Sequence, residues 1–149
     1  MRFRSEHYLA AAQERRDEAW RLLEDGRYGG ALYLTGVSVE CLFWAYRTRS
    51  GFPFEARHDL LGLCKESGML EFITTRNRQK VGEALAELWL RWRNNFRYAG
   101  NQRLKAEFRD RQLDRGIIGD PLKYNAQVAW DSASYVIAMG VAAWTSKTN

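Results

Sequence analysis

The fold class is decided by an apolar run at residues 30–49, GALYLTGVSVECLFWAYRTR, which ends at the helix breakers of SGFP (50–53). Apolar and small residues recur in this run at steps of three and four, the spacing of one helix face. They are Leu32, Gly36, Val39, Phe43 and Tyr46. A glycine in that register lets a neighbouring element approach closely. We therefore expect a central, buried helix over 30–49.

Helical spacing continues on both sides of this run, and the chain has only two prolines to interrupt it. The sequence predicts further helices at 5–24, from about 58 to the residue before Gly68, at 77–98, and from Asp120-Pro121 to about 144. Residues 99–119 are expected to be irregular apart from a short helix at 104–113. No alternating strand pattern persists. About five helices with short connections predict an all-α, up-and-down bundle that forms one domain over 1–149.

Two of these helices carry an apolar stripe that we expect to be buried. In the 77–98 helix the stripe consists of Val81, Leu85, Leu88, Trp89, Trp92 and Phe96. In the last helix it consists of Tyr124, Val128, Tyr135, Met139 and Ala142. Aromatic residues at helical spacing belong to a core more often than to a ligand platform, which favours a core role for Trp89, Trp92 and Phe96. The alternative is that Trp92, Phe96 and Tyr98, interleaved with basic residues, serve as stacking platforms for single-stranded nucleic acid.

The composition excludes several classes of protein. Hydrophobic residues make up 46% of the chain and aromatic residues 13%, which rules out disordered, collagen-like and low-complexity chains. The longest stretch without charge, 132–146, has 15 residues, fewer than the ~20 that span a membrane. No apolar leader follows the charged start, and Cys41 and Cys64 resemble buried thiols of a reducing compartment. We expect a cytoplasmic protein with no membrane contact, no metal and no cofactor.

The positive charge is concentrated in one segment. Residues 91–115 hold eight basic and three acidic side chains, a net +5, whereas the other 124 residues hold 15 of each sign. Such local basicity favours an anionic partner. The alternative is a solvated face on which opposite charges alternate.

Two polar residues stand out in the apolar sequence. Glu40 lies in the middle of the central helix, where an unpaired carboxylate is costly. Arg93 and Arg97 lie one turn apart in the 77–98 helix, so we expect one of them to form a buried structural pair with Glu40. His58, with Asp59, opens the third helix, where we expect a capping role. No phosphate-binding glycine loop and no Glu-x-x-His metal motif occurs.

The segment at 26–42, GRYGGALYLTGVSVECL, fits the pattern G-x-Y-x-x-A-x-Y-x-x-G-x-x-x-E. It resembles the corresponding segment of HEPN (higher eukaryotes and prokaryotes nucleotide-binding) domains. So do His58-Asp59-Leu60 and the later run RNNFRY at 93–98. The resemblance extends in order over about 8–144. It implies an all-helical bundle, commonly a homodimer, and many members are metal-independent RNases of toxin-antitoxin, CRISPR-associated or antiviral systems.

The RNase site of that family implies an Arg, often followed by Asn, and a His after four to six intervening residues. Arg93-Asn94 match the start of this motif, but Tyr98 occupies the earliest place for the His. Imidazole exchanges a proton near neutral pH, whereas a phenol, with an ordinary pKa of about 10, is a poor base. Arg93 and Arg97 still suit a phosphate, and Tyr98 suits stacking on a base. The match therefore favours binding over cutting.

Three hypotheses follow. The first is a non-catalytic or weakly catalytic HEPN-like bundle that binds RNA or a nucleotide through Arg93, Arg97, Tyr98, Arg103 and Lys105. The second is a homodimeric interaction module that docks an antitoxin-type protein partner against the basic segment. The third is a metal-independent RNase with an atypical active site, whose candidates are Arg93, Asn94, Tyr98 and His58, with His58 in place of the missing His.

Overall fold

The computed structural model describes residues 1–55 and 58–146. Within them the chain forms α-helices and two short 3-10 helices, and no strand. The α-helices are α1 (Ser5–Glu24), α2 (Tyr28–Arg49), α3 (Leu60–Ser67), α4 (Thr75–Arg91), α5 (Asn101–Asp110) and α6 (Pro121–Ser146), and the 3-10 helices are η1 (Met69–Phe72) and η2 (Asn94–Tyr98). The predicted all-α class is confirmed. The short helix expected at 104–113 begins earlier, at Asn101.

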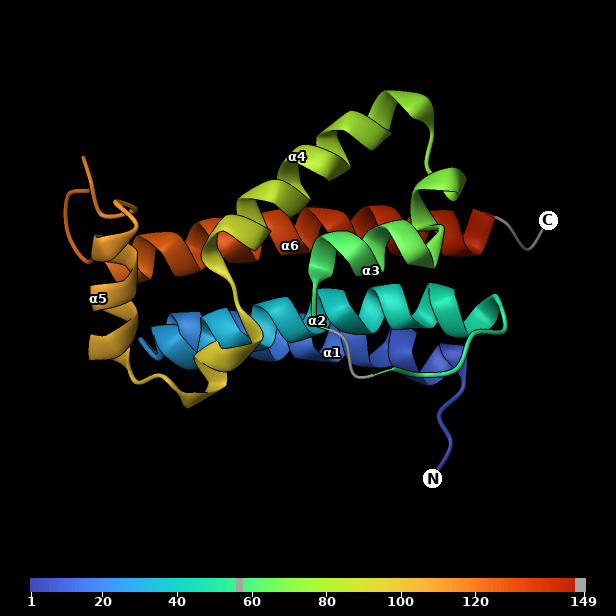
Figure 1. The fold of residues 1–149 in the computed structure, drawn as a ribbon, viewed down its shortest axis with the longest axis horizontal. Coiled ribbons are helices and arrows are strands. Elements are labelled where there is room, and N and C mark those ends of the chain that lie inside the picture. The colour runs from blue at the N-terminus through green and yellow to red at the C-terminus, as the bar shows by residue number, and fades with distance from the viewer. Residues whose placement is uncertain (56–57, 147–149) are drawn as a thin grey trace.

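Three long helices form the body of the molecule (Figure 1). α2 packs against both α1 and α6, and it runs antiparallel to α1 and in the same direction as α6. α4 crosses α6 obliquely, and α5 lies across the end of the bundle at which α6 begins. The predicted helical bundle is thus confirmed. None of the helices described is long and apolar enough to cross a membrane.

The central helix is α2, as the apolar run predicts. Its large side chains face the core, and Leu32, Val39, Phe43 and Tyr46 are each at most 1% exposed. The closest approach is at Gly36, where a β-carbon would lie 2.0 Å from the indole of Trp92. That indole is fully buried, and its Nε1 donates a hydrogen bond of 3.1 Å to the carbonyl of Tyr33. Gly36 therefore admits the Trp92 ring directly against the backbone of α2.

The helix predicted over 77–98 ends early, at Arg91, so the prediction is wrong for its last seven residues, 92–98. α4 stops at Arg91, and Trp92 and Arg93 are extended, with φ/ψ of −126°/139° and −140°/146°, before η2 begins. Burial of the Trp92 indole over Gly36 outweighs the local preference for further helical turns, because packing routinely overrides propensity. As a result, Arg93 and Arg97 do not share a helix face.

Arginine side chains donate hydrogen bonds to the backbone carbonyl groups at the C-terminal end of α4. A helix leaves its last carbonyl groups without partners and with a partial negative charge, so nearby cations stabilise it. Three guanidinium groups donate hydrogen bonds to carbonyls in or just after the last turn. The pairs are Arg91 with Glu87, Arg93 with Trp89 and Trp92, and Arg111 with Leu90. Part of the basicity of 91–115 therefore has a structural purpose.

The face of α6 that packs inward is not the predicted one. Tyr124 is 47% exposed and Ala142 is also exposed, whereas Val128, Tyr135 and Met139 are half-buried. The buried face consists mainly of smaller residues: Leu122, Asn125, Ala126, Ala129, Ala133, Val136, Ile137, Gly140 and Ala143. Small side chains let α6 approach its neighbours closely, because the distance between helix axes depends on the side chains at the contact. The predicted start is confirmed by Asp120, whose Oδ1 accepts the N–H of Leu122 at 2.9 Å.

Both cysteines are free thiols. Cys64 is buried, as predicted, whereas Cys41 is only half-buried. Burial raises the pKa of each thiol to about 11, and the charge of Glu40 adds to the effect at Cys41. A thiol with so high a pKa is a poor nucleophile at neutral pH.

Candidate functional site

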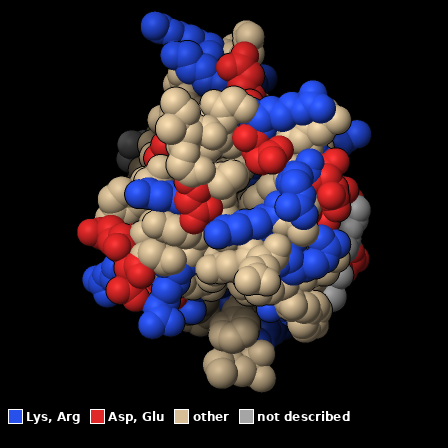
Figure 2. All heavy atoms as spheres, turned by 90° about the vertical axis from the view of Figure 1, so that its left-hand side faces the viewer, with Lys and Arg blue, Asp and Glu red and all other residues tan. Residues whose placement is uncertain are grey.

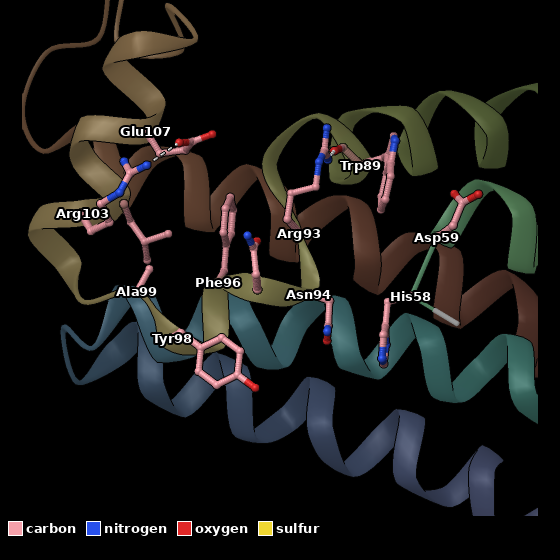
Figure 3. A pocket seen from close by; sticks show the side chains of 12 residues that line it. His58, Asp59, Trp89, Arg93, Asn94, Phe96, Tyr98, Ala99, Arg103 and Glu107 are labelled. Atoms are coloured by element: carbon pink, nitrogen blue, oxygen red, sulfur yellow. Dashed lines mark hydrogen bonds and ion pairs between the residues drawn. The ribbon is translucent and has the colours of Figure 1, made fainter. Parts of the chain in front are cut away.

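A hollow of about 730 Å³ lies where η2, α5, the end of α4 and the residues just before α3 meet (Figure 3). Its floor includes the apolar side chains of Trp89, Phe96 and Leu104. Its polar groups are an imidazole, two guanidinium groups, two amides, a phenol and two carboxylates. They belong to His58, Arg93, Arg103, Asn94, Asn95, Tyr98, Asp59 and Glu107. The Glu107 carboxylate pairs with Arg103 at 3.3 Å. A concave surface with a few converging polar groups is the expected form of a ligand site.

Most of the predicted site residues meet in this hollow, but two do not line it. His58, Arg93, Asn94, Tyr98 and Arg103 all contribute to its wall. The other two lie outside it. Lys105 forms an ion pair with Asp120, with 3.8 Å between Nζ and Oδ2, and the Arg97 guanidinium lies over the Tyr98 ring, 4.9 Å from its centroid.

Arg93 makes several contacts within the protein. Its Nη1 donates to the carbonyls of Trp89 and Trp92, and its guanidinium lies 4.3 Å from the centroid of the Trp89 ring. Burial lowers the pKa of Arg93, and the neighbouring charge of Arg111 lowers it further. These contacts hold the Arg93 guanidinium in the wall of the hollow.

Glu40 pairs with His58, which corrects two predictions. The expected pair of Glu40 with Arg93 or Arg97 does not form; instead, Nδ1 of His58 lies 2.9 Å from Oε1 of Glu40. His58 therefore does not cap α3, and the backbone of Asp59 takes the cap position without a side-chain hydrogen bond. The carboxylate comes from buried α2 and the imidazole from the segment that leads into α3. Their side chains are 11% and 38% exposed, respectively.

The pairing fixes how the imidazole is presented. When Glu40 is ionised its oxygen only accepts, so Nδ1 of the neutral His58 ring then carries the hydrogen and donates it to Glu40. The other ring nitrogen, Nε2, is then the acceptor. His58 and Asn94 both line the hollow, and both side chains are drawn in Figure 3. A histidine oriented by a carboxylate in this way is a recurring arrangement for proton transfer.

Burial dominates the electrostatics of Glu40. Loss of solvation raises the pKa of this carboxyl above its ordinary 4.5, while the hydrogen bond and charge of His58 and the charge of Arg97 oppose the rise. Arg97 thus influences Glu40 through space, although the two do not form the predicted ion pair. The sequence gives one hint of the actual pair: the chain has only two histidines, and one precedes the helix that follows α2.

We expect the variant Glu40→Gln to gain stability, relative to the wild type, as the pH rises. Because the folded-state pKa of Glu40 is raised, the folded protein binds its proton more tightly than the unfolded chain does. That stabilisation is complete below the ordinary value of about 4.5 and is lost as the pH rises through the raised pKa. Glutamine keeps a neutral side chain of the same size at every pH. Urea unfolding of both proteins between about pH 4 and pH 8 measures the difference, and a flat or falling difference would contradict the assignment.

The basic segment does not form a uniform positive surface. Figure 2 shows blue and red side chains interspersed over the end of the bundle that carries α5. Ion pairs join Arg91 to Glu87, Arg103 to Glu107, and Lys105 to Asp120. Two of these carboxylates, Glu87 and Asp120, lie outside 91–115 in the sequence. The alternative reading of interleaved charges therefore describes this face, and any recognition of an anion rests on the hollow.

The aromatic residues divide as predicted. Trp92 and Phe96 are buried and Trp89 is half-buried, whereas Tyr98 is 78% exposed at the rim of the hollow. Over residues 1–55 and 58–146, no three His, Cys, Asp or Glu side chains gather as a metal ion requires. No protein-family model, curated protein or solved structure matches this chain.

Proposed function

We propose that the hollow binds single-stranded RNA or a nucleotide, as part of a HEPN-like bundle. The observation that carries the proposal is the gathering of Arg103, Asn94, Asn95 and Tyr98 around one apolar floor. Unpaired bases are recognised by stacking on an aromatic ring and by hydrogen bonds to their edges, and phosphates by guanidinium groups. The phenol at the rim, the two amides and the guanidinium on α5 supply these three kinds of contact.

The HEPN relationship is supported by where the resembling segments lie. Glu40 comes from the α2 segment, His58 from the second segment and Arg93-Asn94 from the third. They are distant in sequence, yet His58 joins the first two through Glu40 and lines the hollow beside the third. Residues brought together from separate segments are typical of a site, because packing alone does not require polar groups to converge.

The binding proposal is tested by removing one charge from α5 at two neighbouring positions. We expect Arg103→Gln to weaken binding of a labelled single-stranded RNA by about tenfold at low salt, because Arg103 lines the hollow. The slope of log affinity against log salt should fall by roughly 0.7 as one phosphate contact is lost. Fluorescence anisotropy of the same RNA measures both quantities.

The matched control is Lys105→Gln, which removes the same charge two positions along α5 but outside the lining of the hollow. We expect it to leave affinity and salt slope close to the wild type. Equal loss in the two variants would show a non-specific electrostatic effect. If the wild type does not bind the RNA, the proposal is refuted and the homodimeric module with an antitoxin-type protein partner is favoured. That alternative is tested by pulling the partner down from the host and asking whether it stays bound after nuclease treatment.

The Glu40–His58 pair favours a second candidate function, metal-independent RNA cleavage. In this scheme Nε2 of His58 takes the proton of a ribose 2′-hydroxyl, and the 2′-oxygen bonds to the adjacent phosphorus. The bond from phosphorus to the 5′-oxygen breaks, and that oxygen takes a proton from the Tyr98 hydroxyl or from water. The products are a 2′,3′-cyclic phosphate and a 5′-hydroxyl. Arg103 lies on the wall where it can offset the charge that builds up on the phosphate oxygens.

A further inference from the structure

A second hollow, of about 550 Å³, lies at the other end of the segment that carries His58. It is lined by the N-terminal arm, by Tyr8 on α1 and by the segment 52–54. Three phenylalanines there are about half exposed: Phe3 at 49%, Phe52 at 51% and Phe54 at 58%. We call these three residues the phenylalanine platform. Such rings cost free energy in water, so their exposure together is a feature that needs an explanation.

The platform is held in place by other rings. The Phe54 ring lies 4.6 Å from that of Trp44 and 6.3 Å from that of Tyr8, to which it is almost parallel, at 6°. The Phe3 ring packs edge-on against Tyr8 at 5.9 Å. Because these contacts fix the orientation of the rings, a flat ligand meets a surface that is already ordered and loses less entropy on binding.

Two arginines lie beside the platform. The Arg47 guanidinium lies 5.0 Å from the centroid of the Phe52 ring, and Arg2 lines the hollow. No carboxylate is among the described residues that line it. Arg47 is itself paired, because its Nη1 lies 2.7 Å from Oε2 of Glu66 and its Nη2 lies 3.9 Å from Oε2 of Glu55. These carboxylates offset its charge, and Arg2 is the cation that lines the hollow. Exposed aromatic faces beside guanidinium groups are the surface that single-stranded nucleic acid uses.

The platform and the His58 hollow are close enough to serve one strand. Phe54 and His58 are four positions apart, so even a fully extended chain separates them by at most about 14 Å. At roughly 3.4 Å for each stacked nucleotide, about four nucleotides cover that distance. The two hollows are therefore within reach of one short strand.

From these observations we infer that the phenylalanine platform is a second subsite, which stacks bases of the same single-stranded RNA whose neighbouring nucleotides occupy the His58 hollow. The inference rests on the proposed function, since it extends the ligand of that site. It assigns a preference for strands longer than about four nucleotides, because shorter ones reach only one of the two hollows.

The test compares a dinucleotide with an oligoribonucleotide of about eight nucleotides on the full-length protein. We expect the longer RNA to bind the wild type at least about tenfold more tightly. Phe52→Leu with Phe54→Leu should remove about tenfold or more for the longer RNA only, because leucine keeps apolar bulk but has no ring face. Phe54→Trp should preserve the affinity. The salt slope should stay unchanged in the leucine variant, since stacking releases no counterions.

The control is Tyr124→Leu, which removes an exposed ring on α6 that lines a different hollow. Equal affinity of the wild type for the two RNA lengths, or a leucine variant that binds the longer RNA normally, overturns the inference and leaves the platform to a protein or lipid surface. If neither RNA binds the wild type, the proposed function itself fails and the inference with it. Circular dichroism of each variant establishes that it is folded.

Discussion

The variant Gly36→Ala is expected to lose about 3 kcal/mol or more of unfolding free energy, and it carries the largest stability effect that we predict. A β-carbon at this position lies 2.0 to 2.2 Å from atoms of the Trp92 indole. The ring cannot move away cheaply, because it is fully buried and its Nε1 is bonded to the Tyr33 carbonyl. Moving it also leaves a buried donor without its partner, which costs about 1–3 kcal/mol. Urea unfolding measures the loss, which corresponds to a fall in Tm of roughly 10 °C.

Gly82→Ala is the matched control for that substitution. Gly82 lies inside α4, is exposed, and has no atom within 4 Å of the position that a β-carbon would occupy. Alanine stabilises an exposed helix interior relative to glycine by about 1 kcal/mol, so this variant should be more stable than the wild type. The two substitutions add the same methyl group and should shift stability in opposite directions. A Gly36→Ala protein as stable as the wild type would contradict the close packing of the Trp92 indole against Gly36.

If the protein cleaves RNA, His58→Ala is expected to slow cleavage by roughly 10² to 10⁴-fold while leaving RNA binding nearly unchanged. The alanine variant removes the only group that the scheme uses as a base, whereas the stacking and phosphate contacts come from other residues. Added imidazole should restore part of the rate to the variant. An RNA with a single 2′-deoxyribose at the scissile position should bind but not be cut. Single-turnover cleavage of a labelled RNA in a chelator measures the rates.

His7→Ala is the control, because His7 is the other histidine of the chain and its Nδ1 accepts a local hydrogen bond from the backbone N–H of Arg4. It should cleave at the wild-type rate. Undiminished cleavage by His58→Ala, or cutting of the deoxy-substituted RNA, would rule out the scheme. A wild type that binds RNA without cutting it would leave the binding function and remove the second candidate.

Helices were predictable where local sequence decides them. The run at 30–49 is mostly apolar at its buried positions, with Thr35, Ser38 and Glu40 as polar exceptions, so α2 and most of its buried face follow from spacing. The end of α4 was not predictable, because it depends on the contact between Trp92 and Gly36, which are far apart in the sequence. The inward face of α6 was missed for a related reason: helix packing selected small residues such as Ala129 and Gly140 over bulky ones.

The sequence predicted which residues belong to the candidate site better than it predicted how they contact one another. Arg93, Asn94 and Tyr98 were expected together because they are neighbours in the chain, and they line one hollow. The pairing of Glu40 with His58 depends on how the connection after α2 returns to the bundle, and side-chain spacing carries no information about that path. Sequence reasoning gave Glu40 an arginine partner because arginine neutralises a buried carboxylate in any orientation, whereas histidine does so only where the backbone brings it close.

The packing of Trp92 against Gly36 also connects the hollow to the part of the protein that unfolds cooperatively. The residue directly after this contact is Arg93, and Asn94 to Tyr98 follow it in η2. This wall of the hollow is therefore tied to the centre of the core, and we expect it to open together with the core when the protein unfolds. Any compound that occupies it is held by the whole fold, and by mass action it stabilises the whole fold in proportion to its affinity.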